Sequence, residues 1–246
     1  HTVIRETGPL TMQLQDYYHS KNDTVSFSRQ QASDFAKNIA GDFNPIHNID
    51  AKRFCVPGDL LFAVALHHYG LSQKMRVTFS GMITDEAVIF PHAASDNITI
   101  SDASGKQYLT VERIGETTHN PALISELTRN YVAFSGQTFP HILVPLMEKN
   151  GVMINPERPL VIYESMVIDM QRLDASAPTL ELTNSHLDVD GKRGKATLEF
   201  KLVSAGETIG RGTKSMVLSG LREFDAAQIS ALVSEYETWK QNHLQS

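Results

Sequence analysis

An acidic side chain and an imidazole lie five residues apart in the segment GDFNPIH. Gly41 and the Asn44-Pro45 pair interrupt a helix and shape this segment into a loop that proline stiffens. Across such a loop Asp42 and His47 can converge on one water molecule, and histidine is the side chain whose ordinary pKa lies nearest neutrality. The pattern predicts general acid and base chemistry on water, with a purely structural turn as the alternative.

The same loop and the helix predicted before it resemble a known family. The segment from Phe35 to His47, FAKNIAGDFNPIH, is similar to the signature of MaoC-type dehydratases, the R-specific enoyl-CoA hydratases of the hotdog fold. That signature runs aromatic, a few residues, then Gly-Asp-x-Asn-Pro-aliphatic-His. By this resemblance Asp42 and His47 take the places of the catalytic aspartate and histidine of the family. The wider resemblance covers most of residues 24–115.

The resemblance implies a reaction. Its substrate is a trans-2-enoyl thioester of coenzyme A or acyl carrier protein, with no further cofactor. Asp42 and His47 would orient and deprotonate a water that attacks C3, and one of them would return a proton to C2. The product is an R-3-hydroxyacyl thioester, and dehydration is the reverse path. Amides at the start of the central helix would stabilise the thioester oxyanion. The matching position is Gly58, whose missing Cβ permits close approach.

The segment after the loop departs from the family pattern. Only ten residues separate His47 from Gly58, so we expect an acyl pocket unlike that of hydratases with a longer overhang. Asp59 would oppose an oxyanion if its carboxylate pointed inward. Cys55 precedes the helix, where the pKa of a thiol can fall, although buried packing is the default reading. Two alternatives stay open: an inactive acyl-thioester-binding protein, and a hotdog thioesterase in which Asp42 directs water to C1.

A repeat in the sequence predicts the scaffold of this loop. Residues 77–85 (VTFSGMITD) match residues 161–169 (VIYESMVID) at an offset of 84, and both are predicted to be strands. Each follows a predicted buried helix, at 57–70 and at 140–151, that is bounded by proline and glycine. Short β segments and turns follow in both halves. The predicted unit is one central helix with several antiparallel strands, used twice.

The repeat and the resemblance together predict an α+β fold, a double hotdog in which a long central helix is wrapped by an antiparallel sheet in each half. The N-terminal hotdog is expected at 12–118 and the degenerate C-terminal hotdog at 119–224. Residues 225–246 are predicted to form an amphipathic helix packed on the body of the protein. Residues 1–11 lack the apolar core of a signal peptide, and we expect them to be an added or disordered segment before a native start at Met12.

The second half contains an eroded copy of the loop, SGQTFPH, from Ser135 to His141. Gln137 stands where the acid would be, and a glutamine does not accept a proton at neutral pH. We therefore expect one site in the chain, with the second half supplying a wall of the acyl tunnel. A linker between the halves is predicted at residues 115–120.

Composition limits the other function classes. The 246 residues carry 22 Lys and Arg against 28 Asp and Glu, which argues against an electrostatic grip on nucleic acid or anionic lipid. The longest apolar run, Leu60 to Leu66, is far shorter than the roughly 20 residues that span a bilayer. One cysteine excludes an internal disulfide and favours a reducing compartment, so a cytoplasmic location is expected. No metal-ligand spacing is present. The expected partners are an acyl thioester, acyl carrier protein and a second copy of the chain in a homodimer.

Overall fold

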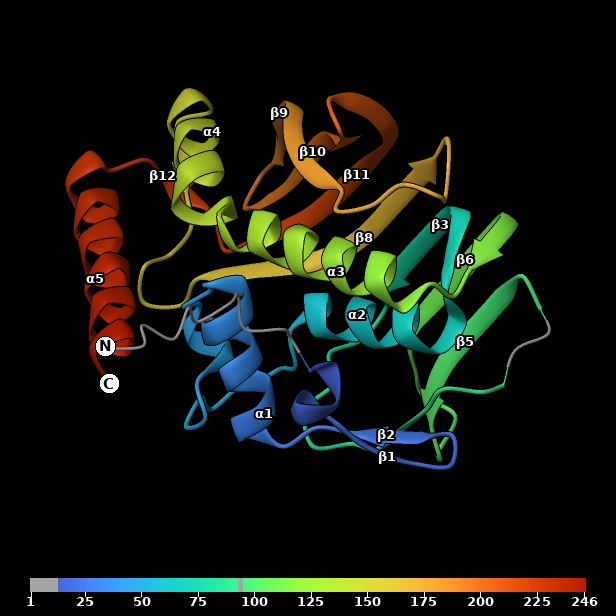
Figure 1. Ribbon diagram of the computed structural model, residues 1–246. Helices are drawn as coiled ribbons and strands as arrows, with labels where there is room; N and C mark the ends of the chain where they lie inside the picture. The colour runs from blue at the N-terminus through green and yellow to red at the C-terminus, as the bar shows by residue number, and fades with distance from the viewer. Residues whose placement is uncertain (1–12, 93–94) are drawn as a thin grey trace, which may run out of the picture.

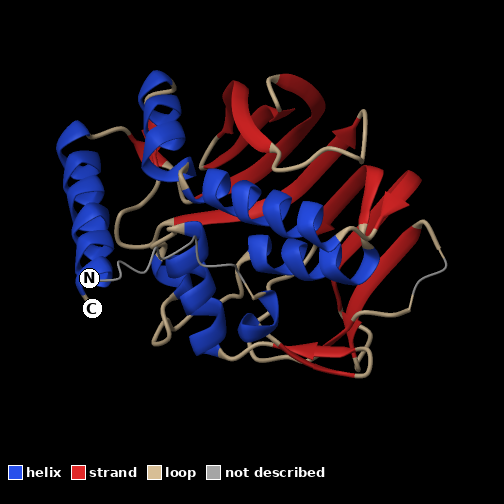
Figure 2. Cartoon of the chain, in the orientation of Figure 1, coloured by secondary structure: helices blue, strands red, loops and turns tan. Residues whose placement is uncertain are grey.

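The computed structural model describes residues 13–92 and 95–246, and its main feature is one antiparallel sheet (Figure 1). Ten strands pair in the order β1-β2-β4-β5-β6-β3-β8-β11-β10-β9. Helices α2 and α3 contact each other and lie across one face of this sheet, with α1, α4 and α5 toward one end of the pair (Figure 2). The predicted α+β class is confirmed. The segment at residues 1–11, predicted to be added or disordered, lies outside the described residues.

The elements divide into those before and those after residue 120, with η marking short 3-10 and π turns. In the first part they are η1 Leu14–Tyr17, β1 His19–Lys21, β2 Thr24–Ser26, α1 Arg29–Asp34, η2 Phe35–Ala40, η3 Pro45–His47, α2 Gly58–Tyr69, β3 Leu71–Phe79, β4 Val88–Ile89, β5 Asn97–Asp102 and β6 Gln107–Thr118. In the second part they are α3 Pro121–Gly136, η4 Thr138–Ile142, α4 Leu143–Lys149, β7 Val152–Met153, β8 Leu160–Met170, β9 Thr179–Asp190, β10 Arg193–Ser204, β11 Glu207–Ser219, β12 Arg222–Glu223 and α5 Ala226–Gln245.

The two parts of the sheet share one strand order. From the centre outward the first part runs β3-β6-β5-β4 and the second β8-β11-β10-β9, so each runs first, fourth, third, second in chain order. The parts join where β3 pairs with β8, with Val77 opposite Met166. The predicted boundary at residues 118 and 119 falls between β6 and α3. Because the sheet continues across both parts, the division into two domains stays a prediction.

The repeat predicted from sequence falls on β3 and β8, but only its second copy is strand throughout. Residues 161–169 lie inside β8, but β3 ends at Phe79, so the prediction of a strand is wrong for residues 80–85. The amides of Ser80 and Gly81 both donate to one carbonyl of β6, at 2.8 and 3.2 Å, which turns the chain out of the sheet. A turn follows, in which the amide and hydroxyl of Thr84 donate to a carboxylate two residues on. Local hydrogen bonds therefore replace the strand that alternation suggested.

Residues 140–151 are largely helical as predicted, since they cover the end of η4 and the helix α4, where Leu143, Leu146 and Met147 are buried. The longer helix that contacts α2 is α3, which was not predicted. The predicted linker at 115–120 is wrong for residues 115–118, because β6 continues to Thr118, and Asn120 caps α3 by accepting from two amides of its first turn. Buried side chains spaced by four residues, Leu123, Leu127 and Tyr131, bind this helix to the core.

Helix α2 lies inside the molecule because it is apolar all round. Residues 60–66 are all buried, with at most 2% of any side chain exposed. Its N-cap is Pro57, which supplies no side-chain acceptor, so the first amides of α2 are left without a cap. No helix among the described residues is long and apolar enough to cross a membrane.

The C-terminal amphipathic helix is confirmed as α5. Asp225 caps it by accepting from the amide of Gln228 at 3.0 Å. Ile229, Leu232 and Tyr236 are buried on the face that packs against the body, as the spacing predicts. This helix therefore covers the region where the predicted catalytic loop emerges.

Candidate active site

The loop between η2 and η3 carries the predicted aspartate and histidine and is held by its own hydrogen bonds. Gly41 ends η2 with a φ of +64°, a left-handed conformation that glycine adopts without a Cβ clash. The amide of Asp42 donates to the carbonyl of Ala36 at 2.8 Å. Asn44 caps η3 with its side-chain oxygen, and Pro45 is the first residue of that turn. Gly41, Asn44 and Pro45, the three residues expected to shape the loop, therefore lie at its turns.

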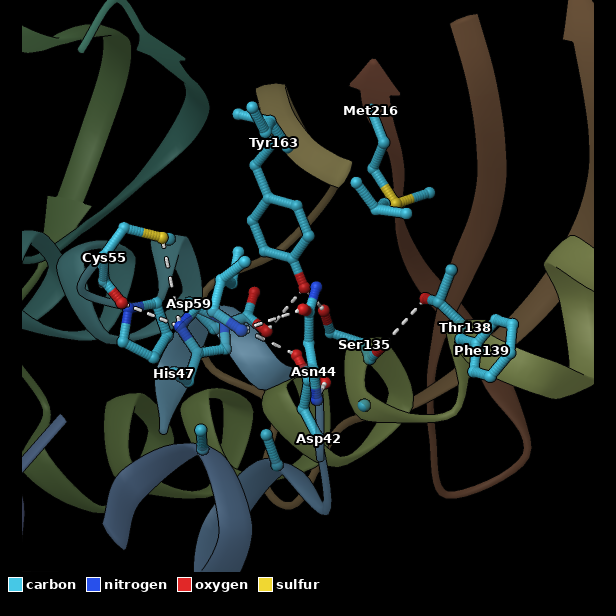
Figure 3. Close-up of a pocket in the computed structure, with 18 of the residues that line it drawn as sticks. Asp42, Asn44, His47, Cys55, Asp59, Ser135, Thr138, Phe139, Tyr163 and Met216 are labelled. Atoms are coloured by element: carbon cyan, nitrogen blue, oxygen red, sulfur yellow. Dashed lines mark hydrogen bonds and ion pairs between the residues drawn. The ribbon is translucent and has the colours of Figure 1, made fainter. Parts of the chain in front are cut away.

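Asp42 and His47 face each other across this loop (Figure 3). Nε2 of His47 lies 3.8 Å from Oδ2 of Asp42. Nδ1 of His47 lies 2.7 Å from the carbonyl oxygen of Cys55, and because a carbonyl only accepts, Nδ1 carries the proton of the neutral ring. Nε2 is then the free base. Since 3.8 Å exceeds a direct hydrogen bond, one water molecule can bond to both groups.

A tyrosine of α5 completes the surroundings of Asp42. The hydroxyl of Tyr236 accepts from the amide of Phe43 at 2.8 Å and donates to Oδ1 of Asp42 at 3.2 Å. Burial and the charge of Asp42 raise the pKa of Tyr236. Tyr236 lies far along the chain from the loop, so no local pattern predicts this contact, and the sequence predicts only that its helix packs on the body of the protein.

The loop opens into an apolar pocket built by both parts of the chain. Its cavity volume is about 110 Å³. Asp42, Asn44 and His47 line it beside the start of α2. Apolar side chains of the lining include Leu61, Ile83, Phe139, Ile154, Val161 and Trp239.

The eroded copy of the loop lies against the same pocket. Ser135, Gly136 and Thr138 line the pocket, whereas Gln137 is exposed to solvent. A Cβ on Gly136 would overlap the carbonyl oxygen of Ala40, so the end of α3 and the end of η2 meet backbone to backbone. The second half therefore supplies one wall of the pocket, and it adds no second acid there through residue 137.

The start of α2 lies at the pocket, but Gly58 differs from expectation in one respect. Both Gly58 and Asp59 line the pocket. A Cβ on Gly58 would stand 2.5 Å from Cδ2 of Tyr163, so the space that glycine leaves is filled by an aromatic ring of β8. The missing Cβ therefore leaves room for the Tyr163 ring. The role of the Gly58 amide as an oxyanion donor stays a prediction.

Three buried polar side chains, those of Asp59, Ser135 and Lys214, meet the half-buried Tyr163 beside the start of α2. The hydroxyl of Tyr163 donates to Oδ2 of Asp59 at 2.9 Å. Oγ of Ser135 lies 2.6 Å from the Tyr163 hydroxyl. The ammonium of Lys214 donates to Oγ of Ser135 and lies 3.7 Å from the centre of the Tyr163 ring. Asp59 belongs to α2, Tyr163 to β8, Ser135 to α3 and Lys214 to β11.

Burial dominates the electrostatics of this cluster. It raises the pKa values of Asp59 and Tyr163, and the charge of Asp42 raises both further. Burial lowers the pKa of Lys214 to about 8, although the charges of Asp59 and Asp42 favour its ammonium. In each of these groups burial therefore favours the uncharged form over the charged form.

Alternation along β11 is the signal that could have found Lys214. It occupies the buried register that Gly212, Met216 and Leu218 share, where an inward lysine is unexpected. Cys55 behaves as packing, because burial and the charge of Asp42 raise the pKa of its thiol to about 12. Over the described ranges no three histidine, cysteine or acidic side chains gather as they would around a metal ion.

Comparison with known families and curated proteins gives one match. A family model described as "Protein of unknown function (DUF3581)" matches residues 12–227. No curated protein matches the chain at the significance required.

Solved structures give distant likenesses. A hot dog fold protein of unknown function from Alicyclobacillus acidocaldarius has a TM-score of 0.44 and 10% identity, covering 85% of this chain and 99% of that one. An acyl-CoA thioesterase II from Mycobacterium marinum has a TM-score of 0.44 and 8% identity, covering 87% and 99%. A MaoC-like dehydratase has a TM-score of 0.41 and 10% identity, covering 82% and 98%. Sequence identities and TM-scores this low assign no activity to this chain.

Proposed function

The chain belongs to the DUF3581 family, and for this member we propose an enzyme that adds water to trans-2-enoyl thioesters, or removes it from R-3-hydroxyacyl thioesters. One observation carries the proposal. Asp42 and the free Nε2 of His47 lie 3.8 Å apart at an apolar pocket that also receives the start of a buried helix. The resemblance of the loop to MaoC-type dehydratases supports the same chemistry.

The loop geometry gives each residue a step. A water bonded to Asp42 and to Nε2 of His47 loses a proton to that nitrogen while its oxygen attacks C3 of the substrate. The carbonyl of Cys55 holds Nδ1–H and so keeps Nε2 available as the base. The imidazolium then returns this proton to C2, directly or by way of the Asp42 carboxylate. Proton transfer by a positioned side chain contributes roughly 10²- to 10⁴-fold to rates of this kind.

Negative charge on the thioester oxygen has a stabilising partner at the start of α2. The first amides of α2 have no side-chain cap, and the helix dipole favours negative charge there. A charged Asp59 would oppose this, as expected from its position in the first turn. Because burial raises the pKa of Asp59, its neutral form is easier to reach, and the neutral acid leaves the dipole unopposed.

The substrate class follows from the two ends of the pocket. The polar end holds groups that act beside a carbonyl, and the remaining lining is largely apolar, which suits an acyl chain. We propose that the two parts of the sheet are a pair of hotdogs, since each repeats the same strand order beside its own helix. Acyl carrier protein as a partner, a homodimer and a cytoplasmic location stay predictions.

The test follows the loss of enoyl absorbance with crotonyl-CoA, trans-2-octenoyl-CoA and trans-2-dodecenoyl-CoA. The variants are Asp42→Asn, which keeps the shape of the side chain, and His47→Ala. Asp188→Asn, at an exposed aspartate on β9, is the matched control. We expect turnover that each of the first two variants lowers at least about 100-fold, and that the control leaves unchanged.

Absence of hydration on all three thioesters, together with binding by calorimetry, would overturn the proposal in favour of an inactive acyl-thioester binder. Release of free thiol from these substrates without loss of the double bond would instead identify a thioesterase. The same reactions repeated with acyl carrier protein thioesters decide whether coenzyme A is the carrier.

A further inference from the structure

Ser135, Lys214 and Tyr163 form a cluster with Asp59, and none of these three takes a step in the addition of water to C3. An unpaired charge buried in this cluster would cost stability, so a purely structural role requires each charged group to be paired with another. The hydrogen bonds form one chain instead of a closed set of pairs. They run from Lys214 through the two hydroxyls to Asp59.

The number of hydroxyl protons decides which group donates and which accepts in each of these hydrogen bonds. Tyr163 has one hydroxyl proton, and it is donated to Asp59. Ser135 must therefore donate to the Tyr163 oxygen while it accepts from Lys214. When Lys214 loses a proton, its lone pair faces Oγ of Ser135, and the hydroxyl can donate to that nitrogen instead. A serine and a lysine within hydrogen-bond distance are a nucleophile and base pair of known type.

The position of the pair in the pocket fits this assignment. Ser135, which is 2% exposed, is one of the residues that line the pocket, and Lys214, which is 1% exposed, lies outside that lining. The Tyr163 ring covers the lysine nitrogen, at 3.7 Å from the ring centre, and helps to exclude water from it. Burial lowers the pKa of this lysine to about 8, so a substantial fraction is neutral in mildly alkaline solution.

We infer that Ser135, with Lys214 as its base, accepts the acyl group of a thioester in the same pocket and forms an acyl-serine. The inference rests on the proposed function only for the class of substrate. Oγ of Ser135 attacks C1 and its proton passes to the Lys214 nitrogen. The bond between carbon and sulfur then breaks, and the lysine returns the proton to the thiolate. Water later hydrolyses the ester, which restores the serine hydroxyl and releases the free acid.

Octanoyl-CoA separates this activity from hydration, because it has no double bond to which water can add. The protein is mixed with octanoyl-CoA at pH 8.5, and free thiol is followed by a colorimetric reagent. Samples quenched in acid are examined by intact mass and peptide mapping. A fluorophosphonate probe, which labels activated serines, is applied separately to the wild type and mapped in the same way.

The variants are Ser135→Ala, Lys214→Met and the control Ser165→Ala. Ser165 is also partly buried and hydrogen-bonded, to Ser215 at 2.8 Å, but it does not line the pocket. We expect a fluorophosphonate adduct on Ser135, and an octanoyl adduct on the same residue in samples quenched before the ester is hydrolysed. Thiol release should be abolished in Ser135→Ala, fall about 10²- to 10⁴-fold in Lys214→Met, and stay unchanged in the control.

Three results would overturn the inference. One is bound octanoyl-CoA with neither thiol release nor an adduct in the wild type. Another is thiol release by Ser135→Ala at the wild-type rate, which would indicate direct attack by water. The third is the absence of a fluorophosphonate adduct from Ser135, a measurement that needs no variant to fold.

If octanoyl-CoA does not bind, the thioester class fails for both proposals, and the probe alone decides whether Ser135 is activated. Hydration of enoyl thioesters without any Ser135 adduct would leave the proposed function standing and remove this inference.

Discussion

The hydroxyl of Tyr236 donates a hydrogen bond of 3.2 Å to Oδ1 of Asp42, although 194 residues separate them along the chain. The same hydroxyl accepts from the amide that follows Asp42, at 2.8 Å. Helix α5 thereby holds both the side chain and the backbone of the loop. The family match ends at residue 227, so most of α5 lies beyond it. Orientation of the loop acid is therefore predicted to depend on a segment outside the matched region.

Tyr236→Phe tests this dependence. The substitution removes one hydrogen bond to Asp42 and leaves the Phe43 amide without its acceptor, which costs about 1 to 3 kcal/mol in stability. We expect kcat for enoyl thioester hydration to fall about tenfold, with KM nearly unchanged, because the ring still fills its site. Tyr69→Phe is the control, since its hydroxyl donates to Pro91 away from the pocket. Equal kinetics in both variants would contradict the positioning role.

Gly136→Ala tests the contact between the two halves of the pocket. The added Cβ would overlap the carbonyl oxygen of Ala40, and neither backbone has room to move without separating α3 from η2. We expect a loss of about 3 kcal/mol or more in the free energy of unfolding, measured by urea denaturation. Gly105→Ala is the control: its φ is +89° with open space around it, so only backbone strain of about 1 kcal/mol applies. Similar losses in both variants would show that overlap with Ala40 is not the cause.

The parts of the site that could be predicted from sequence are those that local chemistry determines. A glycine, an Asn-Pro pair and a histidine within seven residues define the loop, because its hydrogen bonds join neighbours such as Asn44 and Ile46. The central helix α2 was predictable for a similar reason, since its apolar run is continuous.

The second centre could not be predicted because no local pattern joins its members. Ser135 and Lys214 are 79 residues apart and meet only after β11 pairs with β8. Helix α3 was missed for a related reason. Its buried positions, Leu123, Leu127 and Tyr131, are separated mainly by polar residues, and the proline and glycine around residues 140–151 gave a stronger helix signal.

Lys214→Met gives a pH-dependent change in stability. The pKa of Lys214 in the folded protein is about 8, against an ordinary value of 10.5. Between these values the unfolded chain binds more protons, so the free energy of unfolding rises with pH across this window. The penalty for the buried ammonium is complete below about pH 8 and is relieved above it. We expect the stability of the wild type minus that of Lys214→Met to rise by on the order of 3 kcal/mol from pH 7 to pH 10. Urea denaturation at both pH values measures it, with the exposed Lys195→Met as control, and a difference independent of pH would refute it.

Asp59→Asn tests whether the acid beside α2 acts in its neutral form. The amide oxygen of asparagine can accept the same hydrogen bond from Tyr163 that the carboxylate accepts at 2.9 Å, and it carries no charge beside the thioester oxygen. Because burial raises the pKa of Asp59, we expect hydration of trans-2-octenoyl-CoA to stay within about threefold of the wild-type rate, a change of less than about 1 kcal/mol in the barrier. Asp42→Asn makes the same change of atoms in the loop and should lose at least about 100-fold. A comparable loss in Asp59→Asn would mean that the Asp59 carboxylate is itself required, and the start of α2 would then be excluded as the oxyanion site.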